Sequence, residues 1–229
     1  MEFTIIVIIE IVLIIVLKIV FDYSLKKIKE ISKDIELDKI SKKYPDNIEI
    51  CKEYLKMLKN ENVKIEKNDN TKSCVYIAVT NKIVITSISN SYSRIQTIAH
   101  ECLHSIQNRK LLVFNFIFSN IYLIYFWTSS ILTIIGMLKL KTLFLSILLL
   151  LSMIYILTRN YLENDAMIKA KYLAKEYLEK EKISDKLEIE KLVNKFEEIN
   201  NIGIKSVNFS IFLSSMWKII IFCTICIFK

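Results

Sequence analysis

Long apolar runs alternate with Lys- and Glu-rich stretches along this chain. Four of the runs are long enough to cross a hydrocarbon core of about 30 Å at a helical rise of about 1.5 Å per residue. They predict transmembrane helices at residues 3–21, 111–135, 140–158 and 209–228. The first run lacks a basic start and a small-residue cleavage site, which indicates a membrane anchor rather than a secretion signal.

The polar stretches predict a small α+β region outside the membrane. In residues 22–110, the pattern predicts one or two amphipathic helices over 22–60, broken at 44–46 around the single proline. Residues 73–79 and 82–87 are rich in Val, Ile and Thr and predict a β-hairpin, and 93–109 predicts a helix. The strand at 82–87 offers an edge on which an extended peptide could pair. Residues 159–207 predict a second Lys/Glu-rich helical segment.

A few residues inside the apolar runs need their own explanation. Glu10 lies near the middle of the first run, where contact with lipid is costly, so we expect it to face other helices. Lys18 is close enough to the end of that run to extend its ammonium group to the interface. Cys223 and Cys226 form a CxxC pair without a second pair to complete a zinc site. They are read as two small residues on a membrane helix.

Composition and charge narrow the possible classes of protein. The chain is 53% hydrophobic and has only two glycines and one proline, so an all-β fold built on tight turns is excluded. Its net charge of +8 comes from lysines interleaved with acidic residues, with no recognition motif, and we expect no nucleic-acid partner.

The distribution of positive charge predicts the orientation in the membrane. Residues 22–110 contain 17 Lys and Arg and residues 159–207 contain 10, of 32 in the chain. By the positive-inside rule both polar segments are cytoplasmic and both termini lie outside. Five cysteines at irregular spacing are not a disulfide framework, which agrees with a reducing compartment.

The two histidines of the chain, His100 and His104, carry the candidate chemistry. An offset of four places both imidazoles on one face of a helix, where two nitrogens can reach one zinc ion at about 2.0–2.1 Å. Glu101 lies about 100° around that helix, where it can contact a water molecule at the metal. This HExxH arrangement is typical of zinc metallopeptidases, in which the Glu transfers the proton of that water.

A catalytic zinc site needs a third protein ligand, which here must be Asp, Glu or Cys. Glu163 is the best candidate for a geometric reason. His104 lies seven residues before the membrane hairpin begins, and Glu163 lies five residues after it ends. At helical rise both lie roughly 7–10 Å from the same surface, on helices that the hairpin joins.

Residues near these three have predicted supporting roles. Asp165 lies about 200° around the helix from Glu163 and pairs with Lys169 instead. Gln107 continues the histidine face and either supports the site or is an ordinary interfacial polar residue. The remaining expectations are small side chains for close helix approach (Ala166, Ala170), a packed thiol (Cys102), and candidates to stabilise an oxyanion (Tyr92, Tyr161).

On these residues the chain resembles the neutral zinc metallopeptidases anchored in bacterial membranes. The motifs are His100-Glu101-x-x-His104-x-x-Gln107 and Glu163-x-Asp165-Ala166, and the order of spans matches over nearly the whole chain. A more distant likeness is to the HtpX-type membrane proteases. The resemblance implies one Zn²⁺ per chain on His100, His104 and Glu163, with Glu101 as the base. Members commonly have Gly and Ala where this chain has Leu103 and Ser105, neither of which is a metal ligand.

The sequence therefore predicts a mainly α membrane protein with four transmembrane helices and a small cytoplasmic α+β, zincin-like metallopeptidase region. Its expected partners are the lipid bilayer and a peptide or membrane-protein substrate. Two other readings stay open. One is a non-catalytic membrane interaction protein with a structural or lost metal site, whose fourth coordination position Asp165 or Cys102 would close. The other is an inert helical scaffold.

Overall fold

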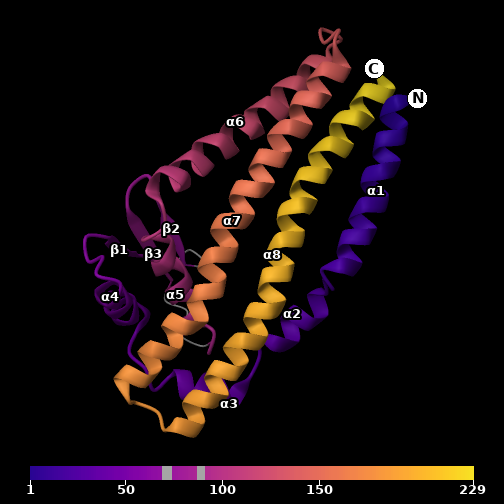
Figure 1. The fold of residues 1–229 in the computed structure, drawn as a ribbon. Helices are drawn as coiled ribbons and strands as arrows, with labels where there is room; N and C mark the ends of the chain where they lie inside the picture. The colour runs from indigo at the N-terminus through magenta and orange to yellow at the C-terminus, as the bar shows by residue number, and fades with distance from the viewer. Residues whose placement is uncertain (69–73, 87–90) are drawn as a thin grey trace. The chain divides into compact units, whose positions relative to one another are not determined.

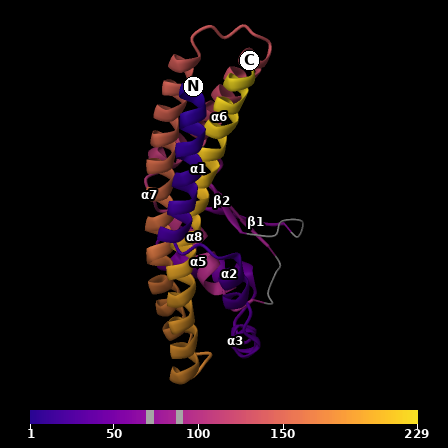
Figure 2. The same ribbon diagram turned by 90° about the vertical axis from the view of Figure 1, so that its right-hand side faces the viewer.

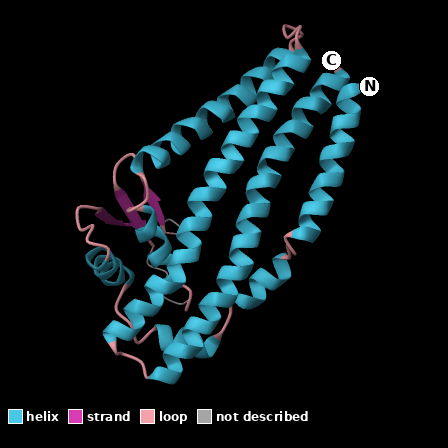
Figure 3. Ribbon diagram, in the orientation of Figure 1, coloured by secondary structure: helices cyan, strands magenta, loops and turns pink. Residues whose placement is uncertain are grey.

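The computed structural model describes residues 1–68, 74–86 and 91–229, and it is mainly helical with one small sheet (Figures 1 and 3). The predicted strand ends at Ser73 and Ser87 lie outside the described residues. The elements, in chain order, are α1 (Glu2–Val20), α2 (Leu25–Ile31), α3 (Ile35–Ser41), α4 (Asn47–Met57), β1 (Lys64–Lys67), β2 (Val75–Ile77), β3 (Lys82–Ile85), α5 (Arg94–His104), α6 (Arg109–Ile134), α7 (Lys141–Glu181) and α8 (Lys186–Phe228).

Four of these helices, α1, α6, α7 and α8, are long and apolar enough to cross a membrane. Their most apolar windows have mean hydropathies of 3.1, 1.6, 2.0 and 2.2 in that order. The predicted spans lie on these four helices, and three of them extend one residue beyond the helix, at Phe21, Ile135 and Leu140. Two helix ends differ from the predicted boundaries, because α7 and α8 continue without a break from apolar into Lys/Glu-rich sequence. The turn between α6 and α7 contains Gly136, whose φ of +76° favours glycine.

The chain divides into two compact units, and each is described by itself. The first unit comprises 1–23, 114–161 and 205–229, and its core includes Tyr122, Leu148 and Phe222. Glu10 belongs to this unit and is 8% exposed, so the expectation that it faces other helices is confirmed. The same core buries Cys223 and Cys226 as free thiols, among the side chains of membrane-type helices.

The second unit comprises 24–113 and 162–204 and contains the short helices and the sheet (Figure 2). The region before the sheet forms three helices, where the sequence predicted one or two. Each begins at a capping side chain, since Ser24, Asp34 and Asp46 accept hydrogen bonds from backbone N–H groups of the first turn. The predicted first helix is divided where α2 ends at Ile31 and α3 begins after its cap at Asp34, and the break at 44–46 is confirmed.

The sheet has three strands in the order β1-β3-β2. The hairpin of β2 and β3 is confirmed, with Tyr76 opposite Ile83. Strand β1, which runs parallel to β3, was not predicted because its sequence Lys-Ile-Glu-Lys is short and mostly charged. Its pairing makes β3 the central strand, so the prediction that residues 82–87 offer a free edge is wrong. Among the described residues, β2 pairs on one side only and is an edge strand.

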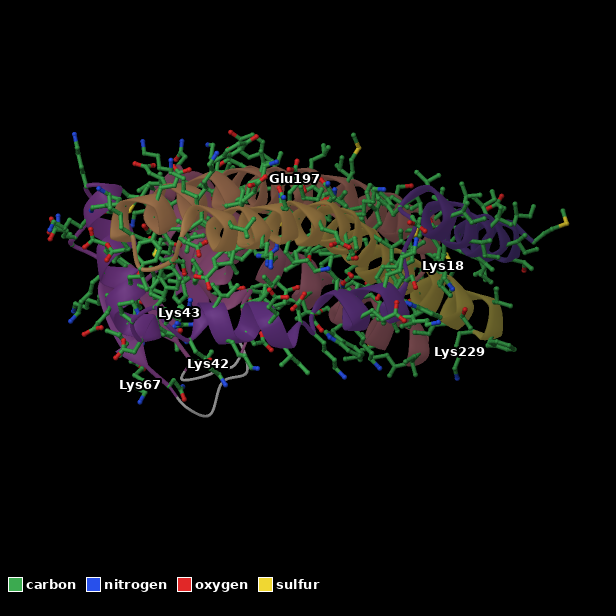
Figure 4. The ribbon with its side chains drawn as sticks, turned by 90° about the horizontal axis from the view of Figure 1, so that it is seen from below. Lys18, Lys42, Lys43, Lys67, Glu197 and Lys229 are labelled. Carbon is green, nitrogen blue, oxygen red and sulfur yellow. The ribbon has the colours of Figure 1, made fainter. Side chains whose placement is uncertain are left out.

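The core of the second unit packs α4, α5 and the sheet against the parts of α7 and α8 that belong to it. Side chains from all of these elements are fully buried in it, among them Ile50, Tyr54, Ile83, Ile98, Ala166, Tyr177 and Phe196. Ion pairs join elements at its surface, such as Lys43 with Glu188 at 2.5 Å and Lys171 with Glu197 at 3.0 Å. Figure 4 labels one member of each pair, Lys43 and Glu197. The core therefore fixes α5 against α7.

A buried arginine at the start of α5 organises the chain between α3 and α4. The Arg94 guanidinium is 6% exposed and donates five hydrogen bonds of 2.6–3.0 Å, all to neutral acceptors. The acceptors are the Ser41 hydroxyl, the Asn47 side chain and three backbone carbonyls (Ser41, Tyr44, Pro45). Buried carbonyl groups need hydrogen-bond donors, and this one side chain supplies them to a turn that has no regular secondary structure.

Replacing Arg94 with Met should destabilise the protein by on the order of 3–5 kcal/mol, because several buried acceptors lose a charged donor at once. Arg94→Lys should be intermediate, since one ammonium group cannot reach all five acceptors. The measurement is thermal unfolding in detergent, together with proteolysis at the 44–46 turn. The matched control, Lys56→Met on the exposed face of α4, should change little, and equal melting of Arg94→Met and wild type would contradict the role.

Candidate metal centre

Helix α5 places both histidines because its opposite face is buried. Ile95, Ile98, Ala99 and Cys102 are completely buried and hold that face in the core. His100 and His104 then share the remaining face, with their Nε2 atoms 3.0 Å apart. The helix spacing predicted from the sequence is therefore present.

Helix α5 ends at His104 and does not continue to residue 109 as predicted. The backbone N–H groups of Ser105, Ile106 and Gln107 each donate to the carbonyl three residues earlier, which makes a tight turn. Asn60 donates to the Ser105 hydroxyl at 2.9 Å and to its carbonyl at 3.1 Å and so fixes the turn. Asn108 then accepts from the first N–H groups of α6. Gln107 thus stands in a turn, folded back toward His104.

Glu163 joins the two histidines from α7. Its Oε2 atom lies 3.4 Å from His100 Nε2 and 3.8 Å from His104 Nε2. Ala166 and Ala170, on the same helix, are buried in the core that contains α5, as close approach of the two helices requires. In the described part of the chain, the group able to hold a metal ion consists of His100, His104 and Glu163.

The three donor atoms fit one metal ion. A tetrahedral site with bonds of about 2.0–2.1 Å separates its donors by about 3.3–3.4 Å. The observed separations of 3.0, 3.4 and 3.8 Å bracket that value. All three side chains are 11–17% exposed, so the protein does not fully enclose the group. Two imidazoles and a carboxylate make a donor set suited to a divalent transition metal.

Glu101 lies beside this group, and a strand holds its carboxylate. Its Oε2 atom accepts a hydrogen bond of 2.7 Å from the backbone N–H of Tyr76, on the edge strand β2. Burial raises the pKa of Glu101, against the lowering effect of the two histidines and of this hydrogen bond. A carboxyl group with a raised pKa next to a metal-binding group is suited to accept and return a proton.

Gln107 links His104 to α7. Its Oε1 atom lies 2.8 Å from His104 Nδ1, and its Nε2 atom donates to the Leu162 carbonyl and to Asp165, both at 2.9 Å. Asp165 also pairs with Lys169 at 2.5 Å, which confirms that predicted pair. Burial alone would raise the pKa of Asp165, but the hydrogen bonds from Lys169 and Gln107 outweigh it and lower the pKa.

The residues proposed to close the fourth position are engaged elsewhere. Asp165 bonds Gln107 and Lys169, and neither it nor Cys102 belongs to the metal-binding group. Cys102 is a buried free thiol 3.6 Å from the sulfur of Cys51, so the packed thiol is confirmed. The fourth position of this group is therefore not filled by either residue.

Of the two tyrosines considered for oxyanion stabilisation, the structure excludes one. Tyr92 is completely buried, and its hydroxyl donates to the Ile31 carbonyl, so it cannot face a substrate. Tyr161 is 64% exposed and lies two positions before Glu163, about 200° around α7. The sequence did not predict that the backbone N–H of Tyr76 donates to Glu101, because no side-chain motif indicates such a contact.

No family model, no curated protein and no solved structure matches this chain. The class of this protein therefore has to be inferred from its own fold and its candidate site. The fold is mainly helical, with four helices long and apolar enough to cross a membrane. The site is a group of two histidines and one glutamate that could hold a metal ion.

Removing a ligand should remove the metal. The wild type should take up one Co²⁺ or Zn²⁺ per chain, and Glu163→Ala should lower the affinity by roughly 100-fold or more, because loss of an outer-sphere partner alone costs about 10–100-fold. Chelator competition and the Co²⁺ absorption spectrum measure this. Glu101→Ala should keep its metal, as should the exposed control Glu190→Ala. Wild-type affinity in Glu163→Ala would show that Glu163 is not a ligand.

Proposed function

We propose that the protein is a membrane-bound zinc metallopeptidase that hydrolyses peptide bonds near the membrane surface. The observation that carries the proposal is the convergence of His100, His104 and Glu163 beside Glu101, although Glu163 lies on α7, 59 residues after His104. Two histidines with HExxH spacing and a third ligand from a later helix form the donor set of peptidases in which the Glu acts as the base.

The group would hold Zn²⁺ through the Nε2 atoms of His100 and His104 and the carboxylate of Glu163. Nitrogen and oxygen donors at these separations suit zinc, and three protein ligands leave one position open, as catalytic zinc sites require. When bound, the ion would polarise the peptide carbonyl and acidify water. One Zn²⁺ per chain is the expected content.

Glu101 carries the proton transfer in this proposal. Its carboxylate would take the proton of the attacking water and deliver it to the nitrogen of the leaving amine, which breaks the C–N bond. The raised pKa that burial gives Glu101 brings its proton affinity closer to that needed for both steps. The hydrogen bond from Tyr76 N–H holds one carboxylate oxygen, which leaves the other for the proton.

The edge of β2 is the natural position for the substrate backbone. The N–H of Tyr76 points away from β3, since it donates to Glu101. An extended peptide that ran along this edge would lie beside the catalytic carboxylate, and its main chain would pair with groups of the edge other than the Tyr76 N–H, which Glu101 occupies. Val75 and Val79 are 43% and 48% exposed next to this edge and would contact apolar side chains of the peptide.

The four apolar helices make the bilayer the expected partner, and the excess of Lys and Arg in residues 22–110 and 159–207 favours a cytoplasmic site. These features support the resemblance to the neutral zinc metallopeptidases anchored in bacterial membranes. Because the chain leaves the site for the membrane within a few residues of Gln107, membrane proteins and their juxtamembrane segments are the substrates we favour.

Replacing Glu101 with Gln should abolish peptidase activity while the metal stays bound. We expect a loss of roughly 10²–10⁴-fold in kcat, the usual contribution of a general base. The assay uses purified protein in detergent or in vesicles, with unfolded peptides and membrane proteins as substrates and cleavage followed by mass spectrometry. Glu190→Gln, an exposed glutamate, is the control.

Three outcomes separate the readings of this protein. Cleavage that needs both zinc and Glu101 supports the peptidase. Stoichiometric metal without any cleavage, over a broad set of peptides and membrane proteins, supports a non-catalytic metal-binding membrane protein. Absence of metal in protein purified with zinc present would leave a helical scaffold and sink the proposal.

The backbone donor on β2 can be tested by a pair of substitutions at one position. Tyr76→Pro removes the N–H, whereas Tyr76→Ala keeps it and loses only the side chain; proline is tolerated on an edge strand. Loss of a hydrogen bond to a charged group costs about 1.5–3 kcal/mol, so kcat/KM should fall about 10–100-fold further in Tyr76→Pro than in Tyr76→Ala. Equal activity in the two variants would show that this N–H has no part in catalysis.

A further inference from the structure

A chain of polar groups leads from the outer nitrogen of His104 to α7. His104 Nδ1 contacts the Gln107 side-chain oxygen at 2.8 Å. The Gln107 nitrogen donates to the Leu162 carbonyl and to Asp165, both at 2.9 Å. Lys169 then pairs with Asp165 at 2.5 Å. His100, the other histidine, has its Nε2 atom in the metal-binding group but no part in this chain.

The acceptors around Gln107 fix the direction of its amide. A backbone carbonyl accepts only, and so does an ionised carboxylate, which means that both contacts at Leu162 and Asp165 need donors. The Gln107 NH₂ group is the one that supplies two donors, so its oxygen must face His104. An amide oxygen only accepts, and His104 Nδ1 must therefore carry the hydrogen.

This hydrogen decides which nitrogen of His104 can bind a metal. In a neutral imidazole with a protonated Nδ1, the Nε2 atom has the free lone pair. His104 Nε2 is the atom that faces His100 Nε2 at 3.0 Å and Glu163 at 3.8 Å. The polar chain thus selects the metal-binding tautomer before any metal arrives.

The same amide also holds the third ligand. Leu162 and Asp165, which receive the two hydrogen bonds of Gln107, lie on either side of Glu163 on α7. A single side chain therefore fixes the ring of His104 and the turn of α7 that presents Glu163. Gln107 itself lies outside helix α5, in the turn that the hydrogen bonds of Asn60 to Ser105 fix.

We propose that Gln107 and Asp165 are positioning residues that set the His104 tautomer and the metal affinity of the site. Asp165 acts through Gln107: it keeps the NH₂ group turned toward α7 and the amide oxygen turned toward His104. Lys169 balances the charge of Asp165 from the exposed side. The proposal rests on the metal site proposed above, but its first consequence concerns the metal-free protein.

That consequence can be measured because the chain has only two histidines. Protein labelled with ¹⁵N at histidine gives two sets of ring signals, which His104→Asn assigns, and long-range ¹H–¹⁵N spectra report the tautomer of each ring. In metal-free wild type, at a pH well above the imidazole pKa, His104 should be protonated at Nδ1. In Gln107→Leu it should shift toward the Nε2-protonated form that free imidazole side chains prefer, whereas His100 should not change.

Metal affinity gives the second readout. Gln107→Leu should lower the Zn²⁺ or Co²⁺ affinity by about 10–100-fold, in the range found for other outer-sphere partners of histidine ligands. Asp165→Ala should cause a smaller loss of the same kind. Lys175→Ala is the control on the exposed face of α7, and its effect should be within a few fold, because its ion pair with Glu179 is largely exposed and lies outside this polar chain.

A double variant that exchanges the donor and acceptor groups of residues 107 and 165, called the reversed pair, separates a positioning role from an effect on stability. Gln107→Glu places a second carboxylate against Asp165, and Asp165→Asn alone removes the charge that orients the amide. Combined, Glu at 107 accepts from His104 and Asn at 165 donates back, so the double variant should bind metal more tightly than Gln107→Glu alone. If the two residues had only a structural role, the losses of metal affinity in the single variants would add in the double variant.

The proposals fail in different ways. A wild type that binds no metal, with His104 still protonated at Nδ1, overturns the peptidase and leaves the tautomer selection standing. A wild type that binds metal, with unchanged tautomer and affinity in Gln107→Leu, overturns the positioning role and leaves the metal site standing. If Gln107→Leu melts well below wild type, two other results decide whether Gln107 has a positioning role. They are the metal affinity of the double variant Gln107→Glu, Asp165→Asn and the His104 tautomer in Asp165→Ala.

Discussion

The site depends on holding one carboxylate of α7 within 3.4–3.8 Å of two imidazoles on α5. Side chains alone cannot hold three metal ligands at such separations, because each has several rotamers and burial of charged groups is costly. Here the backbones are fixed first, by a core in which Ala99, Ala166 and Ala170 are buried together. Small side chains permit close approach of the helices, and the ligands converge as a consequence.

Around the three ligands, hydrogen bonds to main-chain groups orient the neighbouring side chains. The N–H of Tyr76 holds Glu101, the carbonyl of Leu162 receives Gln107, and the carbonyl of Ser105 receives Asn60. Backbone groups are rigidly placed once their elements pack, so each makes a precise partner at little entropic cost. The small sheet thus contributes to the site through its edge strand, although it supplies no metal ligand.

Several corrections share one physical cause. The helix over 93–109 ends at His104, in a turn that Asn60 bonds from 45 residues earlier in the chain. The edge of β3 is covered by β1, whose charged four-residue sequence resembles a loop. Tyr92 is buried by α2 and α3 rather than turned to the site. Each of these contacts joins segments well separated along the chain, where local patterns carry no information.

The sequence by itself determined the four apolar helices, the hairpin of β2 and β3, and the group of His100, His104 and Glu163, because helical periodicity, run length and residue chemistry are local properties. Only the tertiary structure decided that β3 is the central strand and β2 an edge strand, that Tyr76 N–H bonds Glu101, and that Gln107 turns its amide oxygen to His104. Those outcomes depend on which distant acceptors meet a given donor, and packing alone decides that.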